Sequence, residues 1–225
     1  MKSILISIKP EYVEKILNHS KTIEIRKTKP NIKLPCKVYI YCTNGYMLYD
    51  LINEDYLELK KNCTLDMTRK SNKYLSGTPP MLNRRVVAEF TLNKVEEYEL
   101  ELWDNETFES IGKVYYDEET REREVDVFAS DEDIEKTEFV KSSQLSVNDL
   151  RKYLGTGFQT CYAWHIEDLK IYDNPKLLQE FFKPCDGCNK IGSSRCIDET
   201  SSDCRAKVIT RPPQSYMFVE CLEEE

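Results

Sequence analysis

The order of patterns in the first 43 residues limits the fold of this chain more than any other feature. Residues 3–9 alternate isoleucine with small or polar residues, which is typical of a half-buried strand. Pro10 suits the first turn of a helix, and residues 12–17 supply an apolar stripe at helical spacing. Residues 21–27 and 36–43 return to strand-like patterns. The chain is therefore expected to begin strand, helix, strand, strand.

The remaining regular structure is also mostly strand. We expect strands over residues 86–95, 161–171 and 215–222, and one or two helical turns over 175–182. Ser146 and Asp149 have the spacing of a capping box, so a second helix should begin there and end at Gly155. Regular strand–helix alternation, which an open α/β sheet needs, is not in the sequence. The pattern predicts an α+β fold: a small mixed β-barrel with short flanking helices.

Three stretches interrupt this framework. A length of 225 residues with 40% hydrophobic residues suits one globular domain over residues 1–225 with insertions. Residues 44–83 are polar and predict a long loop. Residues 99–140 are acidic with weak periodicity and predict an insertion that holds a short hairpin. Residues 185–207 contain a cysteine cluster.

The formal net charge of −8 hides two regions of opposite sign. Residues 99–138 contain 16 Asp or Glu and 4 Lys or Arg, whereas residues 1–40 contain 9 Lys or Arg and 3 Glu. A basic body is compatible with an RNA or nucleotide partner and equally compatible with plain solvated surface. The acidic stretch 99–138 is a candidate contact for a protein partner.

Charged side chains alternate with isoleucines in the segment His19–Lys27. Ile23 and Ile25 point to one face of the expected strand, while Thr22, Glu24 and Arg26 point to the other, with Lys21 at its start. One interpretation is a solvated face carrying a surface ion pair. The other is a ligand-binding group, in which Lys21 and Arg26 hold phosphate and Glu24 accepts from a base.

Aromatic residues and a histidine provide further candidates. Tyr162, Trp164 and Ile166 share one face of their strand, and we expect the Trp164 face to be core. His165 on the other face either lines a cleft or is a hydrogen-bonded structural residue. Tyr41, with Tyr39, could stack on a base, whereas aromatic residues at strand spacing are more often core.

The cysteine cluster predicts a metal site. Cys185, Cys188, Cys196 and Cys204 have the spacing C-x2-C-x7-C-x7-C in a segment with few apolar residues. Such a segment needs a cross-link to fold, which a tetrahedral thiolate zinc site would provide. Four thiolates leave no open position, so the zinc would be structural. The alternative is four unpaired thiols in a loop.

Nothing in the sequence predicts a membrane protein. No apolar run approaches the roughly 18 residues of a membrane-spanning helix. The N-terminal apolar run is too short for a signal peptide and is interrupted by Lys9. We therefore expect a cytoplasmic protein with no membrane partner, in which the nine cysteines are reduced thiols or metal ligands.

The segment LISIKPEYVEKILNHSKTIEIRK resembles the ASCH domain of the PUA-like superfamily, as found in bacterial and phage proteins. Members commonly show Gly-x-Lys-x-x-Glu-x-Arg after the first helix, which here is His19 followed by Lys21, Glu24 and Arg26. The segments VVAEFTLNKVEE, YAWHI and PPQSYMFVE also look like later ASCH strands. His19 replaces the usual glycine, so the turn must form without it.

The resemblance implies a PUA-like β-barrel whose cleft, lined by Lys21, Glu24 and Arg26, binds RNA or a modified nucleotide. We include Thr22, Tyr41 and His165 as further candidate ligand-binding residues. Some members deacetylate acetylated cytidine, and a few are ribonucleases, so Lys21 and Glu24 would be catalytic if this protein is an enzyme. The deacetylases carry threonine where this chain has Glu24, which argues against that mechanism.

Overall fold

The computed structural model describes residues 2–45, 82–102, 109–184 and 208–220. These residues form two compact units, each built from separate stretches of the chain. The first unit takes in the described part of residues 1–14, 37–89 and 170–225, and the second takes in that of residues 15–36 and 90–169. The single domain over residues 1–225 stays a prediction.

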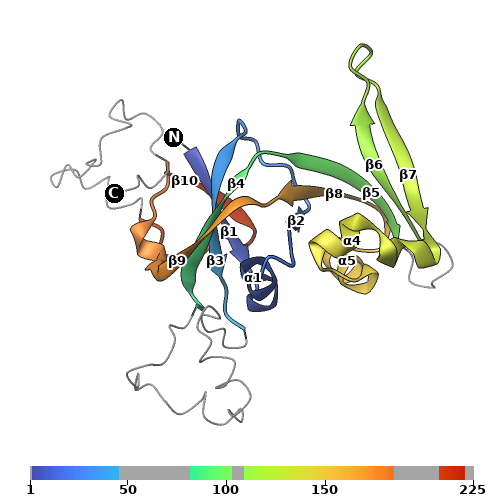
Figure 1. Cartoon of the computed structure of the whole chain (residues 1–225). Helices are drawn as coiled ribbons and strands as arrows, with labels where there is room; N and C mark the ends of the chain where they lie inside the picture. Colours follow the sequence, from blue (N-terminus) through green and yellow to red (C-terminus); the bar gives the residue numbers. More distant parts are fainter. Residues whose placement is uncertain (1, 46–81, 103–108, 185–207, 221–225) are drawn as a thin grey trace, which may run out of the picture. The chain divides into compact units, whose positions relative to one another are not determined.

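Most of the regular structure is strand, as Figure 1 shows. The strands are β1 (Lys2–Ile8), β2 (Ile23–Arg26), β3 (Cys36–Cys42), β4 (Arg85–Leu92), β5 (Val95–Leu102), β6 (Glu109–Tyr116), β7 (Arg123–Ser130), β8 (Gly157–His165), β9 (Glu167–Leu177) and β10 (Tyr216–Glu220). The helices are α1 (Pro10–Leu17), α4 (Glu138–Ser143) and α5 (Val147–Leu154), with 3₁₀ turns η1 (Asp131–Lys136) and η2 (Leu178–Glu180). The predicted α+β class is confirmed.

The first sheet has the strand order β10-β1-β3-β4-β9. β1 pairs in parallel with β3, placing Ile4 opposite Val38, and antiparallel with β10, placing Ile4 opposite Phe218. One apolar cluster forms the core of the first unit: Leu5, Tyr39, Tyr41, Val86, Tyr172, Leu178, Phe181, Ile209 and Val219. The isoleucine alternation of residues 3–9 therefore marks a central strand.

The second sheet has the strand order β2-β8-β5-β6-β7. All four neighbouring pairs of this sheet are antiparallel. β8 lies between β2 and β5 and pairs with both. β6 and β7 form a hairpin, and the chain then returns through η1 to α4 and α5 (Figure 1). Trp164 of β8 is fully buried, as the sequence predicts.

The second predicted helix is confirmed with its caps. The Ser146 hydroxyl accepts from the backbone N–H of Asp149, and the Asp149 carboxylate accepts from the backbone N–H of Ser146. Gly155 ends the helix with a φ of +112°. These local hydrogen bonds need no distant partner, which is why the sequence predicts them.

Several predicted boundaries are wrong. The expected strand 161–171 is two strands, β8 and β9, which break at Ile166, and Val95 opens β5 instead of closing β4. Residues 99–102 belong to β5, a strand inside the second sheet, and the insertion over residues 99–140 stays a prediction. Pro175 continues β9, and only a single 3₁₀ turn follows. These boundaries depend on tertiary pairing, which local composition does not record.

The predicted barrel and loop remain untested. The described strands form two five-stranded sheets with free ends, and a closed PUA-like barrel stays a prediction. The greater part of the loop 44–83 and the whole of the cysteine cluster 185–207, with all four predicted zinc ligands, lie outside the described residues. Among the helices that the structure describes, none has the length and apolar character needed to cross a membrane.

Candidate functional site

The candidate site is the ion cluster Lys21–Glu24–Arg26 at the start of the second sheet, hereafter the triad. The chain leaves α1 through a turn in which His19 has a φ of +61°, at the position where the ASCH motif has glycine. The backbone N–H of Lys21 then donates to the carbonyl of Lys15, and that of Thr22 donates to the carbonyl of Ser142 at the end of α4. These bonds fix the entry into β2.

One carboxylate joins the two cations of the triad. Lys21 Nζ lies 3.2 Å from Glu24 Oε2, and Arg26 Nη2 lies 3.0 Å from Glu24 Oε1. The side chains of Lys21, Glu24 and Arg26 are only 1%, 11% and 7% exposed. The interpretation as a solvated surface pair is therefore wrong. Thr22, by contrast, is exposed beside the triad.

Lys21 is the most deeply buried member. Its ammonium donates to the carbonyl of Ser143 at 2.7 Å, at the C-terminus of α4, where the helix presents unpaired carbonyls. Burial lowers the pKa of Lys21, while the neighbouring Glu24 carboxylate opposes this change. Through these two contacts Lys21 links the C-terminus of α4 to Glu24 and orients the Glu24 carboxylate from its buried side.

The triad carries more charge than a folded core requires. With both cations charged and the carboxylate ionised, its formal charge is positive by one unit. Burying ions costs several kcal/mol each by rough estimate unless they are well paired, so such groups are concentrated at functional sites. Glu24 and Arg26 keep a small exposed fraction through which an anionic or amine-bearing ligand could reach them.

A second ion cluster, which the sequence does not predict, surrounds Glu96 of β5. Its carboxylate lies 2.8 Å from Lys94 Nζ, 2.5 Å from Lys113 Nζ and 2.6 Å from His165 Nε2. Burial raises the pKa of Glu96, but the hydrogen bonds from Lys113, Lys94 and His165 outweigh it and lower the pKa to about 2. His165 is thus hydrogen-bonded within the sheet, the second of its two predicted roles.

Tyr41 lies in the core of the first unit with an exposed fraction of 6%, and Tyr39 is fully buried there. Burial raises the pKa of Tyr41. The two tyrosines are therefore core residues, and a stacking role would require that core to open.

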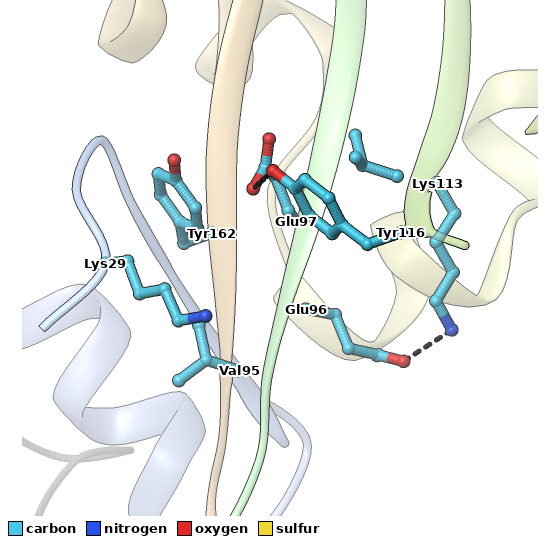
Figure 2. Close-up of a pocket in the computed structure, with 8 residues that line it drawn as sticks. Lys29, Val95, Glu96, Glu97, Lys113, Tyr116 and Tyr162 are labelled. Carbon is cyan, nitrogen blue, oxygen red and sulfur yellow. Dashed lines mark hydrogen bonds and ion pairs between the residues drawn. The ribbon is translucent and has the colours of Figure 1, made fainter. Parts of the chain in front are cut away.

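A pocket of about 170 Å³ lies on the second sheet (Figure 2). Lys29, Glu97, Tyr116 and Tyr162 line it, and none of them is predicted from the sequence as a site residue. Pairing between strands that are distant in sequence brings these residues together, and no local sequence motif predicts that pairing. Among the residues that the structure describes, no group of histidine, cysteine and acidic side chains could hold a metal ion.

Comparison with known proteins gives two solved structures and no sequence match. No family model and no curated protein matches the chain. The chain is similar to the crystal structure of ASCH from Zymomonas mobilis, with 16% identity and a TM-score of 0.40 over 96% of this chain and 85% of that one. It is similar to a mutant of the same protein with the same identity and TM-score, over 96% and 89% of the two chains. Both structures are of an ASCH protein.

Proposed function

We propose that the second unit binds RNA or a modified nucleotide at the triad. The observation that carries the proposal is the burial of two cations and one carboxylate within six residues, in β2 and just before it, with Glu24 and Arg26 still partly reachable. Arg26 is suited to bidentate binding of phosphate, and Glu24 to accepting from an exocyclic amine. The ASCH-like motif and the PUA-like barrel that it implies support the same function.

In this proposal the members of the triad have separate roles. Lys21 is a positioning residue, because its ammonium is held by Ser143 and Glu24 and has almost no exposed surface. Arg26 and Glu24 contact the ligand, and the exposed Thr22 lies at the entrance.

The geometry argues against the enzyme alternatives, an amidohydrolase for acetylated cytidine or a ribonuclease. A general base for water must take up a proton in the reaction. Each oxygen of Glu24 is paired with a cation, Lys21 or Arg26, so proton uptake would cost these ion pairs, whereas accepting one more hydrogen bond from a ligand would not. We expect slow turnover or none.

The test measures binding of labelled single-stranded RNA octamers by fluorescence anisotropy over a range of salt concentrations. Arg26→Gln should weaken binding about tenfold and reduce the salt slope by about one, because one phosphate contact is lost. Lys152→Gln, an exposed cation on α5, is the matched control and should leave both nearly unchanged. An unchanged salt slope in a folded Arg26→Gln variant would overturn the phosphate contact.

Turnover is tested separately with acetylated cytidine. The wild-type chain and Glu24→Gln are incubated with it, and released acetate is followed by NMR. No release above the uncatalysed rate is expected. Efficient hydrolysis that Glu24→Gln abolishes would establish the enzyme instead of the binding module.

The zinc site and the protein partner are separate proposals. One zinc ion per chain, held by the four cluster cysteines, would be measured by elemental analysis and lost in Cys185→Ser. A protein partner at acidic residues 99–138 is the second alternative for function.

A further inference from the structure

Strand register aligns a row of side chains that extends from the triad across the second sheet. Arg26 lies directly opposite Tyr162, and Tyr162 lies directly opposite Glu97. Residues directly opposite one another on neighbouring strands share a face of the sheet. Arg26, Tyr162 and Glu97 therefore lie on one face, in that order.

The pocket of about 170 Å³ lies along this row. In Figure 2, Glu97 lies between the rings of Tyr162 and Tyr116, and Lys29 lies beside Tyr162. Tyr116 is 53% exposed. The pocket thus combines two aromatic rings with two carboxylates and two ammonium groups, and valine side chains lie beside them. Of the charged groups, Glu96 and Lys113 pair with each other, which leaves Glu97 and Lys29 as the groups that a ligand would meet.

Glu97 is held in place yet keeps the capacity to accept more hydrogen bonds. Tyr116 donates its hydroxyl to Glu97 Oε2 at 3.1 Å, and Arg123 Nη2 lies 3.3 Å from Glu97 Oε1. An ionised carboxylate has about four acceptor sites, so the two partners leave room for a ligand donor. The side chain of Glu97 is 16% exposed, which allows such a donor to reach it.

We propose that this pocket takes one unpaired base of single-stranded RNA and prefers a base that carries an exocyclic amine over uracil. Tyr162 and Tyr116 supply stacking surface, Glu97 accepts from the exocyclic amine, and Lys29 contacts a phosphate. Cytosine, adenine and guanine carry such an amine, whereas uracil presents a carbonyl oxygen that the carboxylate repels. The inference rests on the proposed function and extends it, since the neighbouring nucleotide would reach Arg26.

Charge complementarity favours RNA over a peptide. A planar base satisfies both tyrosine rings and the carboxylate at once, and its phosphate complements Lys29. An apolar peptide side chain would fill the space between the rings and cover Glu97 without giving it a donor, which is costly for a carboxylate. The bound strand would then follow one sheet face from the pocket towards the triad.

The experiment compares labelled octamers of cytidine, adenosine and uridine by fluorescence anisotropy. The wild-type chain should bind the first two about tenfold more tightly than the third. Tyr162→Leu should weaken binding of the cytidine octamer about tenfold, and Glu97→Gln should remove the preference over uridine, because an amide both donates and accepts.

A matched control lies on the same strand. Tyr115 neighbours Tyr116, points to the opposite face and is 46% exposed, so Tyr115→Leu should leave affinity unchanged while Tyr116→Leu weakens it. Thermal melts followed by circular dichroism confirm that each variant is folded.

The outcomes separate the two proposals. If Arg26→Gln weakens binding and the Tyr162 and Glu97 variants do not, the pocket inference fails and the triad proposal stands. If the reverse holds, the triad proposal fails and the pocket stands. Equal affinity for cytidine monophosphate and the octamer would overturn RNA as the ligand, and no binding of any octamer would overturn both.

Discussion

Two carboxylates of the second sheet, Glu24 and Glu96, are each paired with more than one cation. They differ in where these cationic partners lie in the sequence. Glu24 lies opposite Trp164, and Trp164 lies opposite Val95, so Glu24 and Val95 share a face. Glu96 is the next residue along β5 and lies on the other face. The triad comes from one short segment, whereas the Glu96 cluster joins residues distant in sequence.

The two clusters also differ in how far water reaches them. Every side chain of the triad is at most 11% exposed, and burial lowers the pKa of Lys21. In the second cluster Glu96 is 10% exposed while Lys94 is 57% exposed. A buried, locally encoded cluster is expensive to keep, and a half-exposed one is not. The difference favours function at the triad and sheet stabilisation at Glu96.

The largest expected effect is at the triad. Glu24→Ala leaves two buried cations facing each other without their carboxylate, which should cost about 3–5 kcal/mol of unfolding free energy. Urea unfolding followed by circular dichroism measures it. Thr22→Ala, at the exposed neighbour, should change stability by less than about 0.5 kcal/mol.

An apolar replacement of the whole triad sharpens this result. Lys21→Met, Glu24→Leu and Arg26→Met combined should recover most of the lost stability, since buried ion pairs often stabilise no better than apolar packing. RNA binding should nevertheless be lost. Full binding by this triple variant would show that the triad has a structural role alone.

A smaller loss is expected where β6 supports the second cluster. A Cβ added at Gly112 would lie 2.6 Å from Val125 Cγ1 and 3.2 Å from the Asp126 carbonyl oxygen. Gly112→Ala should therefore shift β7 against β6 and cost about 2 kcal/mol. Lys113 is the next residue, so the ring resonances of His165 should move in NMR spectra. Adding Val125→Ala should restore part of the stability, and no restoration would contradict the steric cause.

Sequence reasoning found the triad because its signal is local. Lys21, Glu24 and Arg26 lie within six residues and match a motif spacing, and the helix at Ser146 carries its own cap. The partners of His165 could not be predicted, because Glu96 and Lys113 reach it only through strand pairing. Burial of the triad was equally unpredictable, since alternation alone does not tell a solvated face from one covered by α4. The break between β8 and β9 at Ile166 could not be predicted either, because it also depends on strand pairing.

Protonation of Glu96 should produce a moderate, pH-dependent effect. Its pKa is about 2 in the folded chain against 4.5 for the ordinary side chain, so the unfolded state binds more protons between these values. The stabilisation is complete above pH 4.5 and is lost as the pH falls towards 2. Because solvent screens the exposed lysines, Glu96→Gln should cost only about 1 kcal/mol at pH 7.

Urea unfolding at several pH values measures the difference between this variant and the wild type. The two stabilities should converge as the pH falls below 4.5. Glu124→Gln, on exposed β7, should run parallel to the wild type throughout. A difference that persists at the lowest pH would place the effect in packing instead of charge.

The smallest expected effect is a gain, at the turn that leads into the triad. His19 holds a φ of +61°, and its N–H donates to the Ile16 carbonyl at 2.9 Å, so the left-handed conformation is built into the turn. That conformation costs a residue with a Cβ about 1–2 kcal/mol, while glycine adds unfolded-state entropy worth about 0.4–1 kcal/mol. His19→Gly should therefore stabilise the chain by about 0.5 kcal/mol, as measured by urea unfolding. His19→Ala keeps the Cβ and should give no gain, and a gain from both would assign the effect to loss of the imidazole.

Arg121, with a φ of +62° in the turn between β6 and β7, extends the comparison to the hairpin. Because the same backbone strain is relieved there, Arg121→Gly should give a gain of similar size, although that turn supports neither cluster.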